Sequence, residues 1–141
     1  MRIESVFLLA LMLLVPLTPL VEPTEAVSAR SQPCGGSICI NEVMPNPNGY
    51  DDAAWPNGEW LELYNTGTTS VDVRNWYFSN KAAKTLYLDS ASIVGYDAAN
   101  ASTYTLAPGD YMIVARNGAT NFYVANSNDF MTLYDSSNGW V

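Results

Sequence analysis

Residues 59–65, which read EWLELYN, alternate strictly between two kinds of side chain. Leu61 and Leu63 fall on one face of an extended chain, and the aromatic and acidic residues around them fall on the other. A period of two with one wholly aliphatic face is typical of a β strand that buries one side. This segment therefore predicts a strand with Leu61 and Leu63 in the core.

Further short segments of this kind lie on both sides of residues 59–65, at spacings of about ten residues, with turn residues between them. The strands that they predict are Ile38–Met44, 71–73, 76–78, Tyr111–Ala115 and 130–134, with shorter ones at 86–88 and 92–94. Helical periodicity is limited to one turn at 119–126. The pattern predicts an all-β fold, either an antiparallel sandwich or a barrel.

The predicted core follows from these strands. Trp76 is the expected central aromatic residue. Only one of Ile113 and Val114 can face the interior unless their strand is bulged or covered on both sides, because neighbours along a strand point to opposite faces. The core side chains expected are Leu61, Leu63, Trp76, Ile113 or Val114, Met131 and Leu133.

A long loop is predicted at residues 45–58, because its prolines and glycines cannot continue a strand. Asp51, Asp52 and Glu59 lie in or beside this loop, and loop carboxylates are ligands that calcium prefers. Their spacing does not match an EF-hand loop. We expect either a calcium site at these three carboxylates, with calcium as the sole cofactor, or ordinary solvated loop charge.

Aromatic residues in and after this loop are candidate contacts for a binding partner. They are Tyr50, Trp55, Trp60 and Tyr64. For Trp60 and Tyr64 the alternative is that they only cover the outer face of the sheet. Elsewhere, Asn100 begins an Asn-Ala-Ser sequon, which predicts a glycosylated surface loop.

Composition narrows the function classes. The chain has 6 basic and 14 acidic residues, a formal net charge of −8, so phosphate backbones repel it and nucleic acid is not an expected partner. It contains no histidine, which removes the usual general base. Glu59 and Glu62 point to opposite faces of one strand and cannot form the paired carboxylates of a glycosidase. No catalytic residue is predicted, and we expect a protein that is not an enzyme.

The N-terminus has the three parts of a secretory signal. Arg2 precedes the apolar run VFLLALMLLV at 6–15, and the small residues Val-Ser-Ala at 27–29 provide a cleavage site. We predict a signal peptide at 1–29, a short linker at 30–37, and a secreted or cell-surface location. The apolar run is too short to span a bilayer. Membrane contact is therefore expected only through the signal peptide or through an anchor beyond the C-terminus.

The chain has two cysteines, Cys34 and Cys39, in the segment CGGSIC. A disulfide between them is predicted, since secreted proteins oxidise their thiols and the two glycines let the short loop bend. The alternative is that each pairs with a cysteine beyond the end of this chain.

Five segments in order carry a resemblance to a known family. They are ICINEVMPNPNG at 38–49, GEWLELYNTG at 58–67, SVDVRNWYFSN at 70–80, LAPGDYMIV at 106–114 and MTLYDSSNGWV at 131–141. Over residues 38–141 the chain resembles the lamin-tail domain in its prokaryotic secreted and cell-surface form. The resemblance implies an immunoglobulin-like antiparallel β-sandwich.

The resemblance departs from the family in two places. The segment at 81–105 is longer than the usual connection, and the family pattern continues with one or two strands after Val141. A hairpin turn at 135–139 points the same way, because such a turn is normally followed by a returning strand. We therefore expect a sandwich that lacks its last strand or strands, with Met131 and Leu133 beside an open edge.

The resemblance also implies a function. It predicts an extracellular, non-catalytic interaction or anchoring module of a larger secreted or surface protein, with protein or glycan as its partner at the cell exterior. The alternative is a calcium-stabilised accessory domain of a secreted hydrolase or nuclease whose catalytic domain lies beyond residue 141. Lamin tails bind chromatin through basic surfaces, and because this chain is acidic the resemblance does not imply chromatin binding here.

Overall fold

The computed structural model describes residues 36–141. The predicted signal peptide at 1–29 lies outside the described residues, and the predicted linker at 30–37 is described only from residue 36. Within 36–141 no helix has the length and apolar character needed to cross a membrane. The elements in chain order are β1 (Ile38–Met44), β2 (Trp60–Asn65), β3 (Val71–Asp72), β4 (Tyr77–Asn80), β5 (Thr85–Tyr87), the 3-10 helix η1 (Ala101–Tyr104), β6 (Thr105–Leu106), β7 (Tyr111–Ala115) and β8 (Met131–Tyr134).

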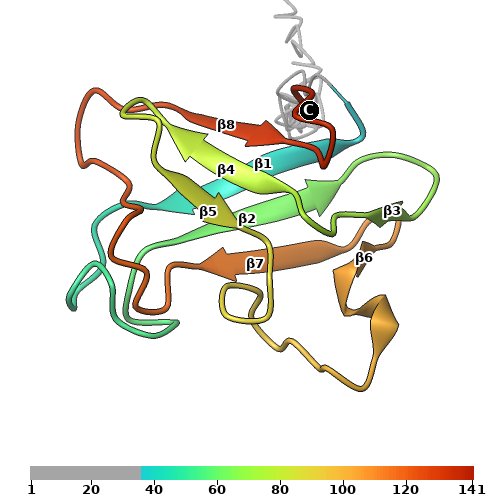
Figure 1. Ribbon diagram of the computed structural model, residues 1–141, viewed down its shortest axis with the longest axis horizontal. Helices are drawn as coiled ribbons and strands as arrows, with labels where there is room; N and C mark the ends of the chain where they lie inside the picture. The colour runs from blue at the N-terminus through green and yellow to red at the C-terminus, as the bar shows by residue number, and fades with distance from the viewer. Residues whose placement is uncertain (1–35) are drawn as a thin grey trace, which may run out of the picture. The chain divides into compact units, whose positions relative to one another are not determined.

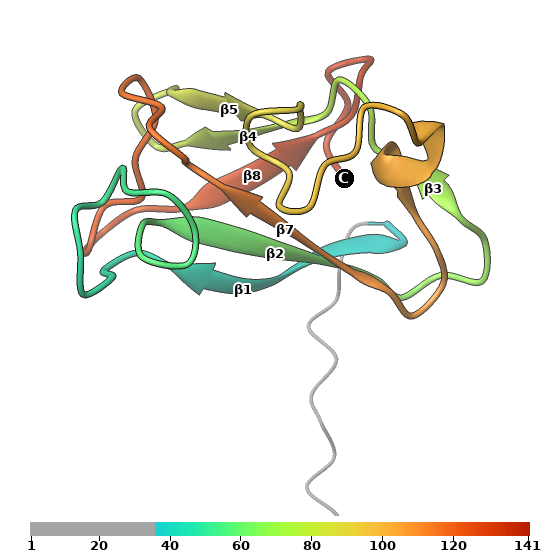
Figure 2. The same ribbon diagram turned by 90° about the horizontal axis from the view of Figure 1, so that it is seen from below.

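The strands of residues 36–141 form three antiparallel sheets. One has the order β1-β2-β7, the second β5-β4-β8, and the third pairs only β3 with β6. The two larger sheets face each other as the layers of a sandwich, with β3 and β6 at one end (Figures 1 and 2). The predicted all-β, immunoglobulin-like antiparallel β-sandwich is confirmed.

A bulge in β1 keeps that strand in register with the core. The pairing with β2 shifts between Ile40 and Glu42, so that Ile40 lies opposite Leu63 while Val43 lies opposite Leu61. Directly opposite residues share a face of the sheet. Ile40 and Val43 therefore both pack against the core, whereas an uninterrupted strand would place them on opposite faces.

Most of the predicted core is confirmed. Leu61, Leu63, Val114 and Leu133 are buried, whereas Met131 is only partly buried and packs against the edge of the core. In β7 the inward position belongs to Val114. The alternation of the strand therefore turns Ile113 outward, where it is half-buried.

Two phenylalanines occupy the centre of the core, where Trp76 was expected. Phe78 and Phe122 are fully buried, while Trp76 keeps 9% of its surface exposed. Phe78 lies inside β4 and has a paired strand on each side, but Trp76 comes just before the first residue of that strand. The choice of Trp76 as the central aromatic is therefore corrected, although Trp76 belongs to the same core cluster.

Helical structure lies elsewhere than expected. Residues 119–126 form no helix and instead carry Phe122 and Val124 into the core. The short helix η1 follows Asn100, whose side-chain oxygen accepts a hydrogen bond from the backbone N–H of Ser102 at 3.0 Å. This is an N-cap, which stabilises the first turn of a helix.

The strand predicted at 92–94 is reduced to an isolated bridge between Ile93 and Val114. Backbone hydrogen bonds on both sides of the bridge hold this segment along the outer edge of β7. The edge of the β1-β2-β7 sheet at β7 is thereby covered, which protects it from pairing with another chain.

The chain turns back after β8, as the sequence predicts for residues 135–139. The carboxylate of Asp135 accepts two backbone N–H groups of this turn, and Trp140 then lies opposite Tyr134. The predicted turn is confirmed. The returning strand expected beyond Val141 stays a prediction.

Candidate functional site

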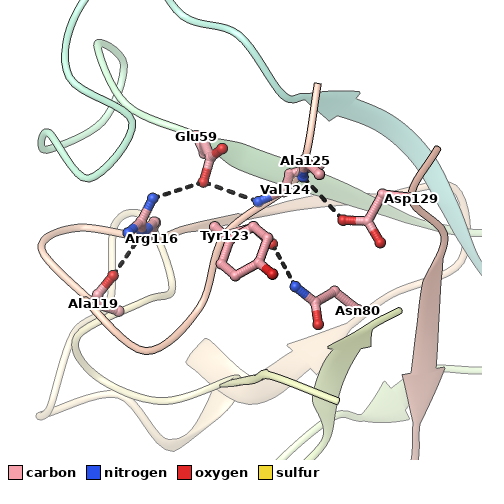
Figure 3. A network of polar contacts seen from close by, with 8 residues as sticks. All are labelled: Glu59, Asn80, Arg116, Ala119, Tyr123, Val124, Ala125 and Asp129. Carbon is pink, nitrogen blue, oxygen red and sulfur yellow. Dashed lines mark hydrogen bonds and ion pairs between the residues drawn. The ribbon is translucent and has the colours of Figure 1, made fainter. Parts of the chain in front are cut away.

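Glu59 is the centre of a buried polar network (Figure 3). Its side chain is only 1% exposed, and Oε2 accepts a hydrogen bond from Nη1 of Arg116 at 3.0 Å and from the backbone N–H of Val124 at 3.1 Å. Nε of Arg116 donates to the carbonyl of Ala119 at 2.6 Å. The carboxylate and the guanidinium are thus bound to each other and to the connection between β7 and β8.

The strand register explains this meeting. Trp60 pairs with Ala115, so the residues just outside that pair, Glu59 and Arg116, lie next to each other. The backbone N–H of Arg116 also donates to the carbonyl of Glu59 at 3.0 Å. Burial raises the pKa of Glu59, while the N–H of Val124 and the guanidinium of Arg116 oppose that rise. The network stabilises the fold, and it commits Glu59 to an internal role.

Two more side chains fasten the same connection to the sheets (Figure 3). Asp129 accepts the backbone N–H groups of Ala125 at 2.9 Å and Lys81 at 3.0 Å, and the amide of Asn80 donates to the carbonyl of Tyr123 at 2.9 Å. Burial alone would raise the pKa of Asp129, but its backbone N–H donors together hold that pKa below the ordinary value. These groups are structural partners of the connection.

Of the three carboxylates of the predicted calcium site, Asp51 is near enough to Glu59 to raise its pKa. Asp51 and Asp52 lie in the 45–58 loop, where their backbone carbonyls accept N–H groups from Glu59 at 2.8 Å and Gly118 at 2.7 Å. Within residues 36–141 no group of three or more acidic or cysteine side chains is placed to hold a metal ion. The calcium site stays a prediction from sequence, and the structure gives Glu59 a different partner in Arg116.

The predicted contact aromatics fall into two places. Tyr50, which is 85% exposed, and Trp55 lie in the 45–58 loop, whereas Trp60 and Tyr64 lie on the outer face of the β1-β2-β7 sheet. There Tyr64 stacks on Tyr111 with ring centroids 4.5 Å apart. The four residues thus come from two elements, the 45–58 loop and β2.

Sequence reasoning missed a row of aromatic side chains on the other sheet. Tyr77 of β4 lies opposite Tyr87 of β5 on one side and Tyr134 of β8 on the other. The ring of Tyr77 stacks on that of Tyr134, with centroids 4.9 Å apart and planes at 8°, and lies 5.2 Å from that of Tyr87. Trp140 extends the row, because residues directly opposite each other share a face. The signal in the sequence is the outward position of a tyrosine in each of three strands.

A second row runs beside the tyrosines. Ser79 lies opposite Thr85 and Thr132, and all three are half-buried. We call the outer surface of this sheet the hydroxyl face, defined by Tyr77, Ser79, Thr85, Tyr87, Thr132 and Tyr134. The side chains between them along the strands, including Phe78 and Leu133, point into the core.

The comparisons with known proteins support one assignment. The sequence model of the Lamin Tail Domain family matches residues 31–141. The chain belongs to the lamin tail domain family. Lamin tail domains are immunoglobulin-like interaction modules, and as domains they are non-catalytic. No curated protein and no solved structure matches the chain.

The two outer faces of this lamin tail domain differ in charge. On the β1-β2-β7 sheet Glu42 lies opposite Glu62, which accepts a hydrogen bond from the amide of Asn41 at 2.6 Å. The hydroxyl face carries no charged side chain. A partner that is repelled by negative charge would therefore bind the hydroxyl face more readily than the outer face of the β1-β2-β7 sheet.

Two predicted modification sites remain, at the cysteines and at Asn100. Cys39 is disulfide-bonded, and Cys34, the other cysteine of the chain, lies outside the described residues. Asn100 is exposed, and its side-chain oxygen caps η1. The Cys34–Cys39 pairing and glycosylation at Asn100 stay predictions.

Proposed function

We propose that this lamin tail domain is a non-catalytic interaction module of a secreted or cell-surface protein, and that it binds a protein or a glycan at the cell exterior. The domain's proposed contact surface is the hydroxyl face together with Trp140. Secretion is proposed from Arg2, the apolar run at 6–15 and the small residues at 27–29.

The observation that carries this proposal is the aromatic row. Tyr87 is 52% exposed and Trp140 is 82% exposed, so the row ends in solvent on both sides. Aromatic side chains are enriched at the anchors of binding interfaces, since they offer a large contact area at a low cost in conformational entropy. The most buried carboxylate, Glu59, is bound by Arg116 inside the fold, which supports a binding role over a catalytic one.

Two measurements test the proposal. N-terminal sequencing of the exported protein is expected to begin at Arg30, and a mature protein that keeps Met1 would contradict secretion. The purified protein, labelled with a fluorophore, is expected to bind isolated cell envelopes of the producing organism. Replacing Tyr87 by alanine is expected to weaken that binding, and equal binding by both proteins would contradict the assignment of the surface.

A further inference from the structure

The hydroxyl face is chemically uniform. Every one of its six side chains ends in a hydroxyl group or carries one, and none is charged. The chain around it has a formal net charge of −8. The opposite sheet face, in contrast, carries glutamates and an exposed stacked tyrosine pair.

The tyrosine rings of this face hold one another in place. Because the rings of Tyr77 and Tyr134 are nearly parallel at 4.9 Å, and Tyr87 contacts the other side of Tyr77, the row is ordered before any ligand arrives. The hydroxyl of Tyr77 is fixed further by donating to the side-chain oxygen of Asn138 at 3.1 Å. A preorganised surface loses little side-chain entropy on binding.

The hydroxyl of Tyr77, at the middle of the row, stays protonated over a wide pH range. Desolvation raises the pKa of Tyr77 above its ordinary value of 10.0, and the neighbouring Tyr134, Tyr87 and Asp135 raise it further. An uncharged hydroxyl both donates and accepts a hydrogen bond, so the Tyr77 oxygen, whose proton is donated to Asn138, can still accept one from a ligand.

We propose that the hydroxyl face binds an uncharged polysaccharide, with the exposed rings of Tyr87 and Trp140 against the C–H surfaces of sugar rings and the tyrosine, serine and threonine hydroxyls paired with sugar hydroxyls. This inference rests on the proposed function and names its ligand class. An extended polysaccharide also fits the shape of the row, which crosses three strands and the bridge to Trp140, with strands about 4.8 Å apart.

The chemistry of the face argues against the other ligand classes. The centre of a protein interface is apolar and enriched in aromatic residues, Met and Arg; this face has the aromatic residues but no aliphatic side chain, no methionine and no arginine. An anionic polysaccharide would meet the carboxylate of Asp135 next to Tyr134 and the negative charge of the whole domain. A neutral ligand rich in hydroxyl groups is not repelled by this negative charge, and it can form hydrogen bonds with the hydroxyls of the face.

Affinity electrophoresis with the purified protein tests the inference. Native gels would contain one soluble polysaccharide each: a mixed-linkage β-glucan, an arabinoxylan, a galactomannan, or polygalacturonate as the anionic comparison. Retardation by at least one neutral polysaccharide, and none by polygalacturonate, is expected. Tyr87→Ala removes an exposed ring of the row and Ser79→Glu places a charge on the face, and each should weaken the retarding interaction about tenfold.

Tyr111→Ala is the matched control. Tyr111 is 57% exposed and stacks on Tyr64, so it resembles Tyr87 in exposure and ring contact but lies on the other sheet face. Its replacement is expected to leave retardation unchanged. Thermal melts verify folding, and all three variants are expected within about 5 °C of the parent, since surface substitutions change stability little.

The inference is overturned if no neutral polysaccharide retards the protein, if polygalacturonate retards it more strongly, or if Tyr111→Ala removes retardation as fully as Tyr87→Ala. Binding to isolated cell envelopes distinguishes failure of the polysaccharide inference from failure of the proposed function. Binding that survives periodate oxidation of the envelope sugars but not proteolysis would keep the interaction module and overturn the polysaccharide. Absence of any envelope binding would contradict the interaction module itself.

Discussion

Arg116→Met removes the cation that compensates the buried carboxylate of Glu59. The two side chains are 11% and 1% exposed, and Nη1 lies 3.0 Å from Oε2, so water cannot replace the lost partner without opening the core. Breaking a buried ion pair from one side costs about 3–5 kcal/mol, because the remaining charge stays desolvated. For a domain of this size that lowers the melting temperature by more than about 10 °C.

The loss of unfolding free energy caused by Arg116→Met should depend on pH in a defined direction. Burial raises the pKa of Glu59 above its ordinary value of 4.5, so the folded state holds this proton more tightly than the unfolded state does. The contribution of Glu59 to the unfolding free energy is therefore fully present below pH 4.5 and is lost as pH rises through the folded pKa. Without Arg116 that pKa rises further, so the destabilisation is largest near neutral pH and shrinks as the solution is acidified toward pH 4.5.

Urea unfolding of parent and variant, near neutral pH and at about pH 4, measures both effects. Arg74→Met is the control, because Arg74 forms an exposed pair with Asp72 at 3.7 Å that is worth about 1 kcal/mol or less. Adding Glu59→Gln to Arg116→Met should recover part of the loss, since no buried charge then remains. If Arg116→Met lowers the unfolding free energy no more than Arg74→Met does near neutral pH, the Glu59 network does not hold the connection between β7 and β8 as described.

Two further substitutions and one mass measurement test the fold and the predicted disulfide. Leu63→Ala empties a fully buried position and should cost about 2–5 kcal/mol in urea unfolding; a loss below about 0.5 kcal/mol would place Leu63 on the surface. Gly58→Ala should destabilise the protein by about 1–3 kcal/mol, because an added Cβ would collide with the backbone oxygen of Ala53, and an unchanged melt would show that the loop gives way. Mass spectrometry of the exported protein should show a mass about 2 Da below that of the reduced form for the Cys34–Cys39 disulfide, and two alkylatable thiols would exclude it.

The strands were predictable where the alternation of side chains is local. The predicted bounds of β1 and β7 agree with the structure, and β2 begins one residue later than predicted. The bulge between Ile40 and Glu42 was not predictable, because it is a property of how β1 pairs with β2. Phe122 was missed because the apolar residues at 122–124 follow one another without alternation, and only contacts with distant segments bury Phe122 and Val124.

The candidate site shows the same limit. Glu59 follows Asp51 and Asp52 by eight and seven positions at the end of the same loop, which predicts a cation ligand. Its partner Arg116 is 57 positions away and is brought to it by the pairing of β2 with β7. The tyrosines of the hydroxyl face come from three strands, so their row can be recognised only when the strand order β5-β4-β8 is known. Sequence alone predicts which way each tyrosine points along its own strand, but it does not predict their neighbours.

Nuclear magnetic resonance of the isotope-labelled protein can map where a neutral polysaccharide binds, and we expect it to bind at the hydroxyl face. The probe is a soluble oligosaccharide cut from whichever neutral polysaccharide retards the protein. Amide signals of β4, β5, β8 and Trp140 should shift on titration, while those of β1, β2 and β7 stay in place. Shifts confined to the β1-β2-β7 sheet or to the 45–58 loop, or no shifts at saturating oligosaccharide, would contradict the account.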